Sequence, residues 1–557
     1  MTDLAGLRGL DLEARHDRAG TQAADQAISA IPTTRTARSS FASVRHVALV
    51  IDPARARNVH REIATRLTRE AGIRVTIRRG RAAEPLPSSV GLLLGLERLI
   101  DRSAASRLSD PLDISRWPLP EPAANDAPDI VIDFCGGETP PGQRTLSVLY
   151  DGLPDEAVLL GALLAGRMPV IEIADAQTNL AVSRGTACAD NAGTILGAFE
   201  CVLARVVNLV VSAVRGWATL GLAPPATARA ARLQDVIAFE TKALAHSAVR
   251  RLYHLCCYAP HWRTCWRFVD GPGLLDTGTV AGTSWNVIPD PGFRFYADPF
   301  PFVHEGRTYV FVEDLDHRTN KGIISVVPFD ARGPTGPAQP VLEEPWHLSY
   351  PFVFAHEGQV WMIPESSANR AITLYRAEAF PHRWVREATL IADIEASDAT
   401  IVHHHGSFWM FAATRDGAGS WSDTLSLFSA PDPRGPWQPH PGNPILIDQA
   451  AARPAGAMVK RDGKLWRPVQ DCSAGYGTGI GLVEILRLDR DAYEQRLHTV
   501  LRPDPSWPGR RFHTLNRAGR LECIDGAAHS PRSRWLARRL EDWSGRREPP
   551  PNWPRAI

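Results

Sequence analysis

The second half of the chain repeats one short pattern five times. Each copy has an apolar strand, a turn that contains glycine and a second apolar strand, and the copies recur every 48 to 57 residues. A period of this length with several strands per unit is typical of β-propeller blades. An irregular β-sandwich would not keep five copies in one register. We therefore predict an all-β five-bladed propeller over residues 285–530. Its turn glycines are Gly306, Gly358, Gly406, Gly463 and Gly519.

Residues 44–222 have a different pattern and predict a separate domain. Strands that alternate with helices favour a parallel α/β sheet, here of the Rossmann-like class. A chain of 557 residues also exceeds what one hydrophobic core usually holds, about 250–300 residues. The fold class that we expect is therefore multidomain. The apolar runs that predict strands are 44–51, 73–77, 129–134, 145–150 and 170–173.

Three further segments connect or flank these domains. Residues 1–43 are polar and without periodicity, which predicts a disordered leader. Residues 223–284 hold a Pro/Ala linker and then a helix that bridges the domains and packs on one side. Residues 531–557 form a basic, proline-containing tail that we interpret as solvated, with contact to anionic lipid or a partner as the alternative. The apolar residues of the bridging helix are Val236, Ile237, Leu244, Val249, Leu252 and Leu255.

Composition narrows the choice of partner and compartment. A net charge of +1 gives no support for nucleic-acid binding. The N-terminus has no apolar signal-peptide core, and none of the eight cysteines forms a Cys-x-x-Cys pair. The apolar stretch 195–214 contains Glu200 and Arg205, which favours a buried helix over a membrane span. We predict a cytoplasmic protein with peripheral membrane contact as an option, and the sequence leaves its oligomeric state undecided.

The turn glycines align the repeat units with one another. The first strand of a propeller blade lines the central channel, so side chains at equivalent positions are expected to converge on the axis. Eight residues before each glycine, the five units carry Asp298, Tyr350, Asp398, Ala455 and Arg511. Seven residues after each glycine, they carry Glu313, Glu365, Ala413, Gln470 and Gly526.

Carboxylates at these positions are candidate catalytic residues. Glycosyl chemistry needs one carboxyl group as acid or base and another that attacks or stabilises the anomeric centre. Asp298, Glu365 and Asp398 could supply such a pair, with Glu313 in reserve. For each, a turn, cap or strand-start role is the structural alternative. The candidate substrate-binding residues are Tyr350, His347, Arg415, Gln470, Asp471, His513 and Asn516.

We expect neither a metal nor a bound cofactor. Three consecutive histidines occupy positions 403–405, but neighbours on a strand point to opposite faces and cannot all ligate one ion. A nucleotide-sugar would enter as a donor substrate.

Five segments within residues 293–402 carry a resemblance to known propellers. Their sequences are FRFYADPFPF, HLSYPFVF, MIPES, LYRAEAFPHRW and SDATIV. They resemble the N-terminal module of plant glucosamine inositolphosphorylceramide transferases, which is similar in fold to family-43 glycoside hydrolases. The family-43 pattern implies a base at Asp298, an orienting Asp in another blade and an acidic Glu in a third. This chain departs from it, with Tyr350 in the second blade and Asp398 in the third.

The α/β domain carries a second resemblance. The segment PDIVIDFCGG at 128–137 resembles a formyltransferase-like Rossmann fold, as in bacterial proteins that join the two modules. The HxSLLP-like segment of folate-dependent formyltransferases is absent, and no GxGxxG follows the first strand. We interpret this domain as degenerate, with a role in assembly or binding.

Three functions fit these patterns. The first is an enzyme, transferase or hydrolase, that makes or cleaves a glycosyl bond in bacterial envelope or exopolysaccharide biosynthesis. The second is a non-catalytic module that binds a glycan or nucleotide-sugar through aromatic side chains such as Trp346, Trp361 and Trp409. The third is formyl or acyl transfer by the α/β domain.

Overall fold

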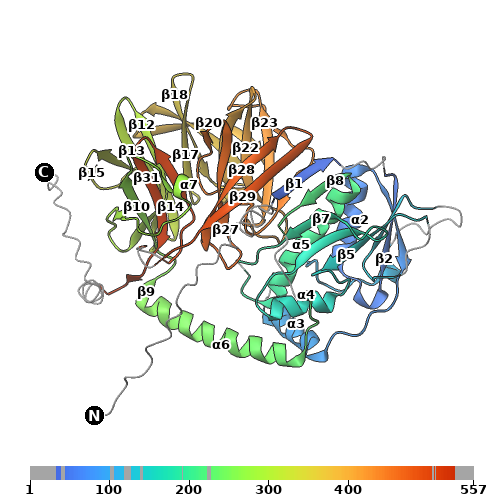
Figure 1. The fold of residues 1–557 in the computed structure, drawn as a ribbon. Helices are drawn as coiled ribbons and strands as arrows, with labels where there is room; N and C mark the ends of the chain where they lie inside the picture. Colours follow the sequence, from blue (N-terminus) through green and yellow to red (C-terminus); the bar gives the residue numbers. More distant parts are fainter. Residues whose placement is uncertain are drawn as a thin grey trace, which may run out of the picture.

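The structure is a computed structural model with two parts, an α/β domain and a β-rich domain (Figure 1). Between them lies a strand that makes both parts share one sheet. The residues that the structure describes are 33–38, 44–100, 106–117, 127–137, 142–190, 192–222, 228–504, 507 and 510–533.

The α/β domain contains a mixed sheet whose parallel half has the strand order β3-β2-β4-β5. The expected parallel arrangement is present there, whereas β6 runs antiparallel to both β5 and β7. The strands are β2 (His46–Ile51), β3 (Arg74–Arg79), β4 (Ile130–Asp133), β5 (Thr145–Tyr150), β6 (Val170–Asp175), β7 (Ala181–Thr186) and β8 (Trp217–Leu220). The helices are α2 (Asn58–Ala71), α3 (Ser88–Ile100), α4 (Glu156–Leu164) and α5 (Ile195–Val214), with short 3-10 helices η2 (Pro53–Arg55) and η3 (Ile114–Arg116).

Helix α5 is the central helix of this domain. By length and hydropathy it could cross a membrane, but 89% of its most apolar window is buried inside the protein. Glu200 accepts hydrogen bonds of 2.9 Å from the backbone N–H groups of Leu108 and Ser109. Arg205 forms a salt bridge with Asp423 of the β-rich domain. Both polar residues are therefore paired inside the fold, and the predicted buried helix is confirmed.

The β-rich domain consists of five antiparallel repeat units. The first has β12 (Arg294–His304), β13 (Arg307–Asp316) and β14 (Lys321–Asp330), with β15 (Gly333–Pro334) and β16 (Gln339–Leu342) both paired to β14. The second has β17 (Ser349–His356), β18 (Gln359–Glu365), β19 (Ala371–Ala379) and β20 (Arg383–Ala392), with η4 (Ser367–Asn369). The third has β21 (Glu395–His404), β22 (Ser407–Arg415), β23 (Thr424–Ala430), β24 (Gln438–Pro439) and β25 (Leu446–Ile447). The fourth has β26 (Val459–Arg461), β27 (Lys464–Asp471), β28 (Gly479–Leu488) and β29 (Ala492–Leu501).

The fifth unit is assembled from both ends of the domain. Its strands β30 (Leu515–Ala518) and β31 (Leu521–Ala527) continue into β10 (Trp262–Phe268) and β11 (Asn286–Val287) in one sheet. The predicted domain start at residue 285 is therefore wrong, because β10 lies in the segment assigned to the linker. Pairing an early strand with the last one closes the ring and covers an open sheet edge.

Strand β1 (Thr33–Arg38) joins the two domains. It runs antiparallel to β29 on one side and to β8 on the other. The fourth unit and the α/β sheet thereby become one sheet of twelve strands, in the order β26-β27-β28-β29-β1-β8-β7-β6-β5-β4-β2-β3. Thr34 and Thr36 are buried in it, and Arg35 is exposed.

Two predictions are corrected by this sheet. The leader 1–43 is not disordered throughout, because 33–38 bonds to two sheet edges at once. The remainder of the leader, 1–32 and 39–43, lies outside the described residues. Five separate blades were expected, but four units form sheets of their own and the fourth in sequence continues into the α/β sheet. The domain is thus propeller-like with four separate blades.

Helix α6 (Leu233–Cys256) bridges the domains along one side of the molecule (Figure 1). It contacts α3 and α4 at one end and β9 (Cys257–Tyr258) at the other. Val236 is buried, but the other apolar residues that were predicted to pack are exposed. The predicted packing is therefore wrong for most of the helix. Strand β9 pairs with β32 (Ser530–Pro531), and the short helix α7 (Leu274–Thr277) lies between β10 and β11 in the chain. The tail beyond residue 533 lies outside the described residues.

Candidate functional site

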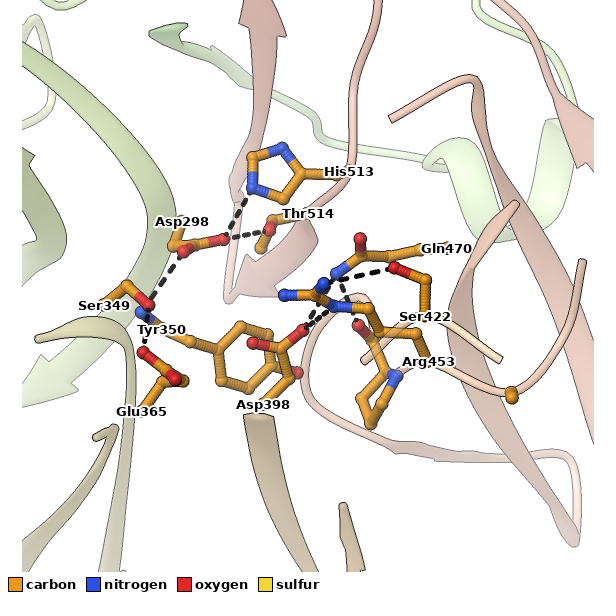
Figure 2. A network of polar contacts seen from close by, with 12 residues as sticks. Asp298, Ser349, Tyr350, Glu365, Asp398, Ser422, Arg453, Gln470, His513 and Thr514 are labelled. Carbon is orange, nitrogen blue, oxygen red and sulfur yellow. Dashed lines mark hydrogen bonds and ion pairs between the residues drawn. The ribbon is translucent and has the colours of Figure 1, made fainter. Parts of the chain in front are cut away.

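Three residues at one position of successive repeat units point toward one another in Figure 2. Asp298 on β12, Tyr350 on β17 and Asp398 on β21 have φ values of 49°, 43° and 56°, in the left-handed region. Strand pairing is irregular at each of them. Such a backbone costs on the order of 1–3 kcal/mol per residue, and a bulge re-aims the side chain that it carries. The shared geometry confirms the register derived from the turn glycines for these three units.

Asp298 is 4% exposed and is held by three donors. Its Oδ1 accepts a hydrogen bond of 2.5 Å from Thr514 Oγ1 and lies 3.1 Å from His513 Nε2. Its Oδ2 accepts a hydrogen bond of 3.2 Å from the backbone N–H of Tyr350. Burial alone would raise the pKa of Asp298, but the charge of His513 and the hydrogen bonds from His513 and Thr514 hold it below its ordinary value. Asp298 is therefore ionised at neutral pH.

His513 lies between two carboxylates. Its Nδ1 is 3.1 Å from Asp525, on the side opposite Asp298. Burial would lower the pKa of His513, but the charges of Asp525 and Asp298 raise it to about 10. The ring of Trp262 packs against the imidazole, with centroids 4.2 Å apart. His513 is thus a buried imidazolium that keeps Asp298 negative.

The same residues have the spacing of a cation site. The ligand atoms of Asp298, His513 and Asp525 lie within 4.8 Å of one another. Because both ring nitrogens of His513 face carboxylates, a cation there would have to displace a proton. Among the described residues, the histidines at 403–405 belong to no such group.

Asp398 is 2% exposed and meets two donors from the fourth unit (Figure 2). Its Oδ2 accepts hydrogen bonds from Arg453 Nε at 2.6 Å and from Gln470 Nε2 at 3.0 Å. Burial raises the pKa of Asp398 to about 6, although Arg453 opposes the rise and lowers it. A carboxyl group with this pKa can bind and release a proton near neutrality.

Tyr350 is completely buried beside these carboxylates. Its hydroxyl accepts a hydrogen bond of 2.8 Å from the backbone N–H of Gly456 and lies 2.9 Å from Thr400 Oγ1. Its ring packs edge-on against Phe300. Tyr350 therefore supports Asp298 from inside the core, and its predicted substrate-binding role stays a prediction.

Glu313 lies in β13 and Glu365 ends β18, and they are 7% and 8% exposed. Glu365 accepts a hydrogen bond of 3.0 Å from Ser349 Oγ. Glu313 Oε1 lies 3.3 Å from His347 Nε2. Burial, and then the charge of Asp298, raise the pKa of Glu313 well above its ordinary value. Burial and the ionised Asp298 therefore both favour the neutral form of Glu313.

The predicted substrate-binding residues fall into two groups. His347, Gln470 and His513 belong to the network, although Gln470 and His513 are buried and hold carboxylates in place. Only His347 reaches the rim, with 36% of its side chain exposed.

Three other candidates lie outside the network. Arg415 donates to the carbonyl oxygen of Gly419, and Asp471 forms an ion pair with Arg502. The amide of Asn516 bonds to backbone groups of neighbouring strands. These contacts give the three residues structural roles, and their binding of a ligand stays a prediction.

The structure adds residues that the register did not indicate. Arg453 lies two residues before Ala455, the position counted as equivalent, in a loop that does not follow the strand register. In the fifth unit Gly519 is the first of two turn residues, whereas in the others the glycine is the second. Counting from Gly519 gave Gly526, and Asp525 lies one residue before that position. The added residues are Ser349, Ser422, Arg453, Thr514 and Asp525.

The four candidate carboxylates are 2–8% exposed, so only their edges reach solvent. A cavity of about 280 Å³ lies elsewhere, between the two domains, with Arg66, Trp217 and Asp416 in its lining. A ligand over the carboxylates would meet rim groups such as His347 and the half-buried Tyr476.

The β-rich domain matches a known family. The family model described as glucosamine inositolphosphorylceramide transferase 1, N-terminal, matches residues 282–523, which include all four candidate carboxylates. Over 233 residues the chain is 34% identical to glucosamine inositolphosphorylceramide transferase 1 of Oryza sativa subsp. japonica, covering 40% of this chain and 31% of that protein. The Arabidopsis thaliana protein of the same name is 33% identical over 260 residues. This match covers 45% of this chain and 34% of the Arabidopsis protein.

The chain therefore spans about a third of the length of these curated relatives. The match begins at residue 282 and does not bear on formyl or acyl transfer by the α/β domain.

Similar solved structures are glycoside hydrolases. A thermostable family-43 glycoside hydrolase is 13% identical and has a TM-score of 0.28. The match covers 38% of this chain and 77% of the hydrolase chain. A family 117 glycoside hydrolase of Zobellia galactanivorans is 12% identical and has a TM-score of 0.31. The match covers 44% of this chain and 77% of the hydrolase chain.

Proposed function

We propose that the centre of the propeller-like ring is the active site of a carbohydrate-active enzyme that makes or cleaves a glycosyl bond. The observation that carries the proposal is the separation of two carboxyl pKa values within one network. Asp298 is held ionised, and Asp398 has a pKa of about 6. Glycosyl chemistry uses one ionised and one protonated carboxyl group. Asp298 is the base or nucleophile, and Asp398 exchanges the proton with the bridging oxygen.

The neighbouring residues support these roles. His513 keeps Asp298 negative through its charge and its hydrogen bond, which outweigh the effect of burial. Arg453 and Gln470 fix the orientation of Asp398, and Arg453 keeps its pKa from rising further. Burial and the charge of Asp298 favour the neutral form of Glu313, and this form can donate a hydrogen bond to a sugar hydroxyl.

The relatives support sugar transfer as the reaction. They are named glucosamine inositolphosphorylceramide transferase 1, and the matched region holds the four carboxylates. We propose that this chain uses a nucleotide-sugar donor in the biosynthesis of a bacterial envelope glycan or exopolysaccharide. All eight cysteines are free, which supports a reducing, cytoplasmic compartment.

A non-catalytic module that binds a glycan is the second candidate. The low exposure of the carboxylates favours it, because an enzyme must bring both groups into contact with substrate. Of the aromatic residues predicted for this role, Trp361 and Trp409 are buried, and Trp346 is half-buried. Only Trp346 remains a candidate to stack on a sugar.

Titration against a panel of nucleotide-sugars and oligosaccharides, by calorimetry with product detection by mass spectrometry, separates the two functions. Asp298→Asn is expected to lower turnover by about 10²–10⁴-fold. Asp462→Asn is the matched control, because Asp462 also has a left-handed backbone, at φ 50°, but its side chain is 85% exposed. Binding without turnover by all three proteins would establish the binding module. If the unchanged protein neither binds nor turns over any member of the panel, both functions are refuted.

A further inference from the structure

Exposed apolar side chains concentrate on two helices. In the part of the chain that the structure describes, ten of the fourteen large apolar residues that are exposed lie on α3 or α6. The two helices contact each other at the start of α6. The residues on α3 are Leu92, Leu96, Leu99 and Ile100. Those on α6 are Leu233, Ile237, Leu244, Val249, Leu252 and Leu255, with exposures between 59% and 77%.

Helix α6 presents its apolar side away from the protein. In its first half, Val236 and Phe239 pack toward the α/β domain, while Leu233 and Ile237 face solvent. At 3.6 residues per turn, the side that carries Ile237 continues through Leu244 to Leu255. Surface helices normally bury this stripe. Here the stripe runs outward along a helix of about 36 Å, at 1.5 Å per residue.

The charges on α6 indicate what covers this stripe. Residues 241–256 contain Lys242, Arg250 and Arg251 and no Asp or Glu. Lys242 and Arg251 border the apolar stripe at 3.6 residues per turn, and long basic side chains can reach past such a border. An apolar stripe bordered by cations is the pattern of a helix that lies in a membrane interface rich in anionic lipid. A second copy of the same face would bring like charges together.

We propose that α6 and the outer side of α3 form a docking face for a membrane surface that contains anionic lipid. The apolar side chains of the stripe enter the interface, and the basic residues contact lipid phosphates. Because α6 is anchored to the α/β domain at one end and to β9 at the other, docking would hold both domains at the membrane in one orientation. The proposal is independent of any chemistry at the carboxylates.

Vesicle flotation with the full chain tests the docking face. One set of vesicles is phosphatidylcholine alone, and the other is three parts phosphatidylcholine to one part phosphatidylglycerol. We expect binding to the anionic set and little to the neutral set. The triple variant Leu244→Ser/Leu252→Ser/Leu255→Ser should lower the binding constant by about tenfold or more, because it removes apolar contact area. Arg251→Glu alone should lower it by about fivefold or more on anionic vesicles.

The matched control changes exposed apolar residues elsewhere. Leu153→Ser/Leu180→Ser also removes exposed apolar side chains, but outside α3 and α6. Leu180 is 69% exposed, as is Leu244. This variant should bind vesicles like the unchanged protein, and the circular dichroism of all variants should agree. Absence of flotation with anionic vesicles would overturn the proposal. So would a dimer in light scattering that the triple variant converts to a monomer, or vesicle binding that appears only after residues 1–32 are removed.

Discussion

Arg205 of helix α5 and Asp423 of the third repeat unit form a salt bridge of 2.7 Å in which neither side chain reaches solvent. Asp423 also accepts a hydrogen bond from the backbone N–H of Cys188, and Arg205 donates to the carbonyl oxygen of Ser420. The pair lies between the α/β domain and the propeller-like ring. Because a buried charge without its partner is costly, each domain stabilises a residue of the other.

Removal of one partner should therefore be severe. Arg205→Met leaves Asp423 buried and unpaired, with an expected loss of about 3–5 kcal/mol in the free energy of unfolding. Urea denaturation measures it, and Arg205→Met/Asp423→Leu should recover part of the loss. Arg66→Met is the control. Arg66 and Asp416 pair across the same interface, but their side chains are 19% and 42% exposed. This substitution should therefore lower the free energy of unfolding by about 1 kcal/mol or less. Equal losses for the two variants would contradict the proposed anchor.

Strand β1 should be needed for the domains to unfold together. Thr36→Pro removes a donor from a strand that bonds to sheet edges on both sides, with an expected cost of about 3 kcal/mol. Calorimetry should then resolve two transitions in place of one, because the shared sheet is interrupted. Arg35→Ser, on the exposed side of the same strand, should leave one transition. A single, unshifted transition in Thr36→Pro would show that β1 does not couple the domains.

His513 predicts a loss of stability at high pH. Its pKa rises from 6.5 to about 10 on folding, so its contribution is fully present below pH 6.5 and disappears as the pH rises through 10. Between neutral pH and pH 11, unfolding free energy should fall more steeply in the unchanged protein than in His513→Gln, by on the order of 3 kcal/mol. His403→Gln, at an exposed site, should follow the unchanged protein. Parallel curves for His513→Gln and the unchanged protein would contradict the buried imidazolium.

Arg453 should set the pH range of turnover. It opposes the rise in the pKa of Asp398, so Arg453→Gln should raise that pKa above about 6. If Asp398 donates the proton, the alkaline limb of kcat/KM moves to higher pH by about one pH unit. Arg415→Gln, outside the network, should leave the profile in place. A limb that moves to lower pH, or not at all, would remove Asp398 from the acid role.

The sequence predicted those parts of the site that depend on local backbone. Asp298, Tyr350 and Asp398 could be aligned because each sits at a bulge a constant distance before its turn glycine. Arg453 and Asp525 could not be placed, because Arg453 lies in a loop and Asp525 is not at the position equivalent to Glu313 and Glu365. The exposed side of α6 was also missed, since periodicity shows that a helix has an apolar side but not what lies opposite it.

The sequence by itself determined the repeat period, the alternation of strands and helices before it, and the carboxylates at equivalent positions, because these follow from side-chain patterns within single elements. Only the tertiary structure decided which edges meet. Strand β1 joins the domains by pairing with β29 and β8, and β10 closes the ring by pairing with β31. The paired strands lie roughly 180 residues or more apart in the sequence. Any strand of suitable length can satisfy the hydrogen bonds of an open edge, so the choice is made by the packing of the whole chain. The same packing, and no local pattern, shifts the pKa of Asp298 down and the pKa of Asp398 up.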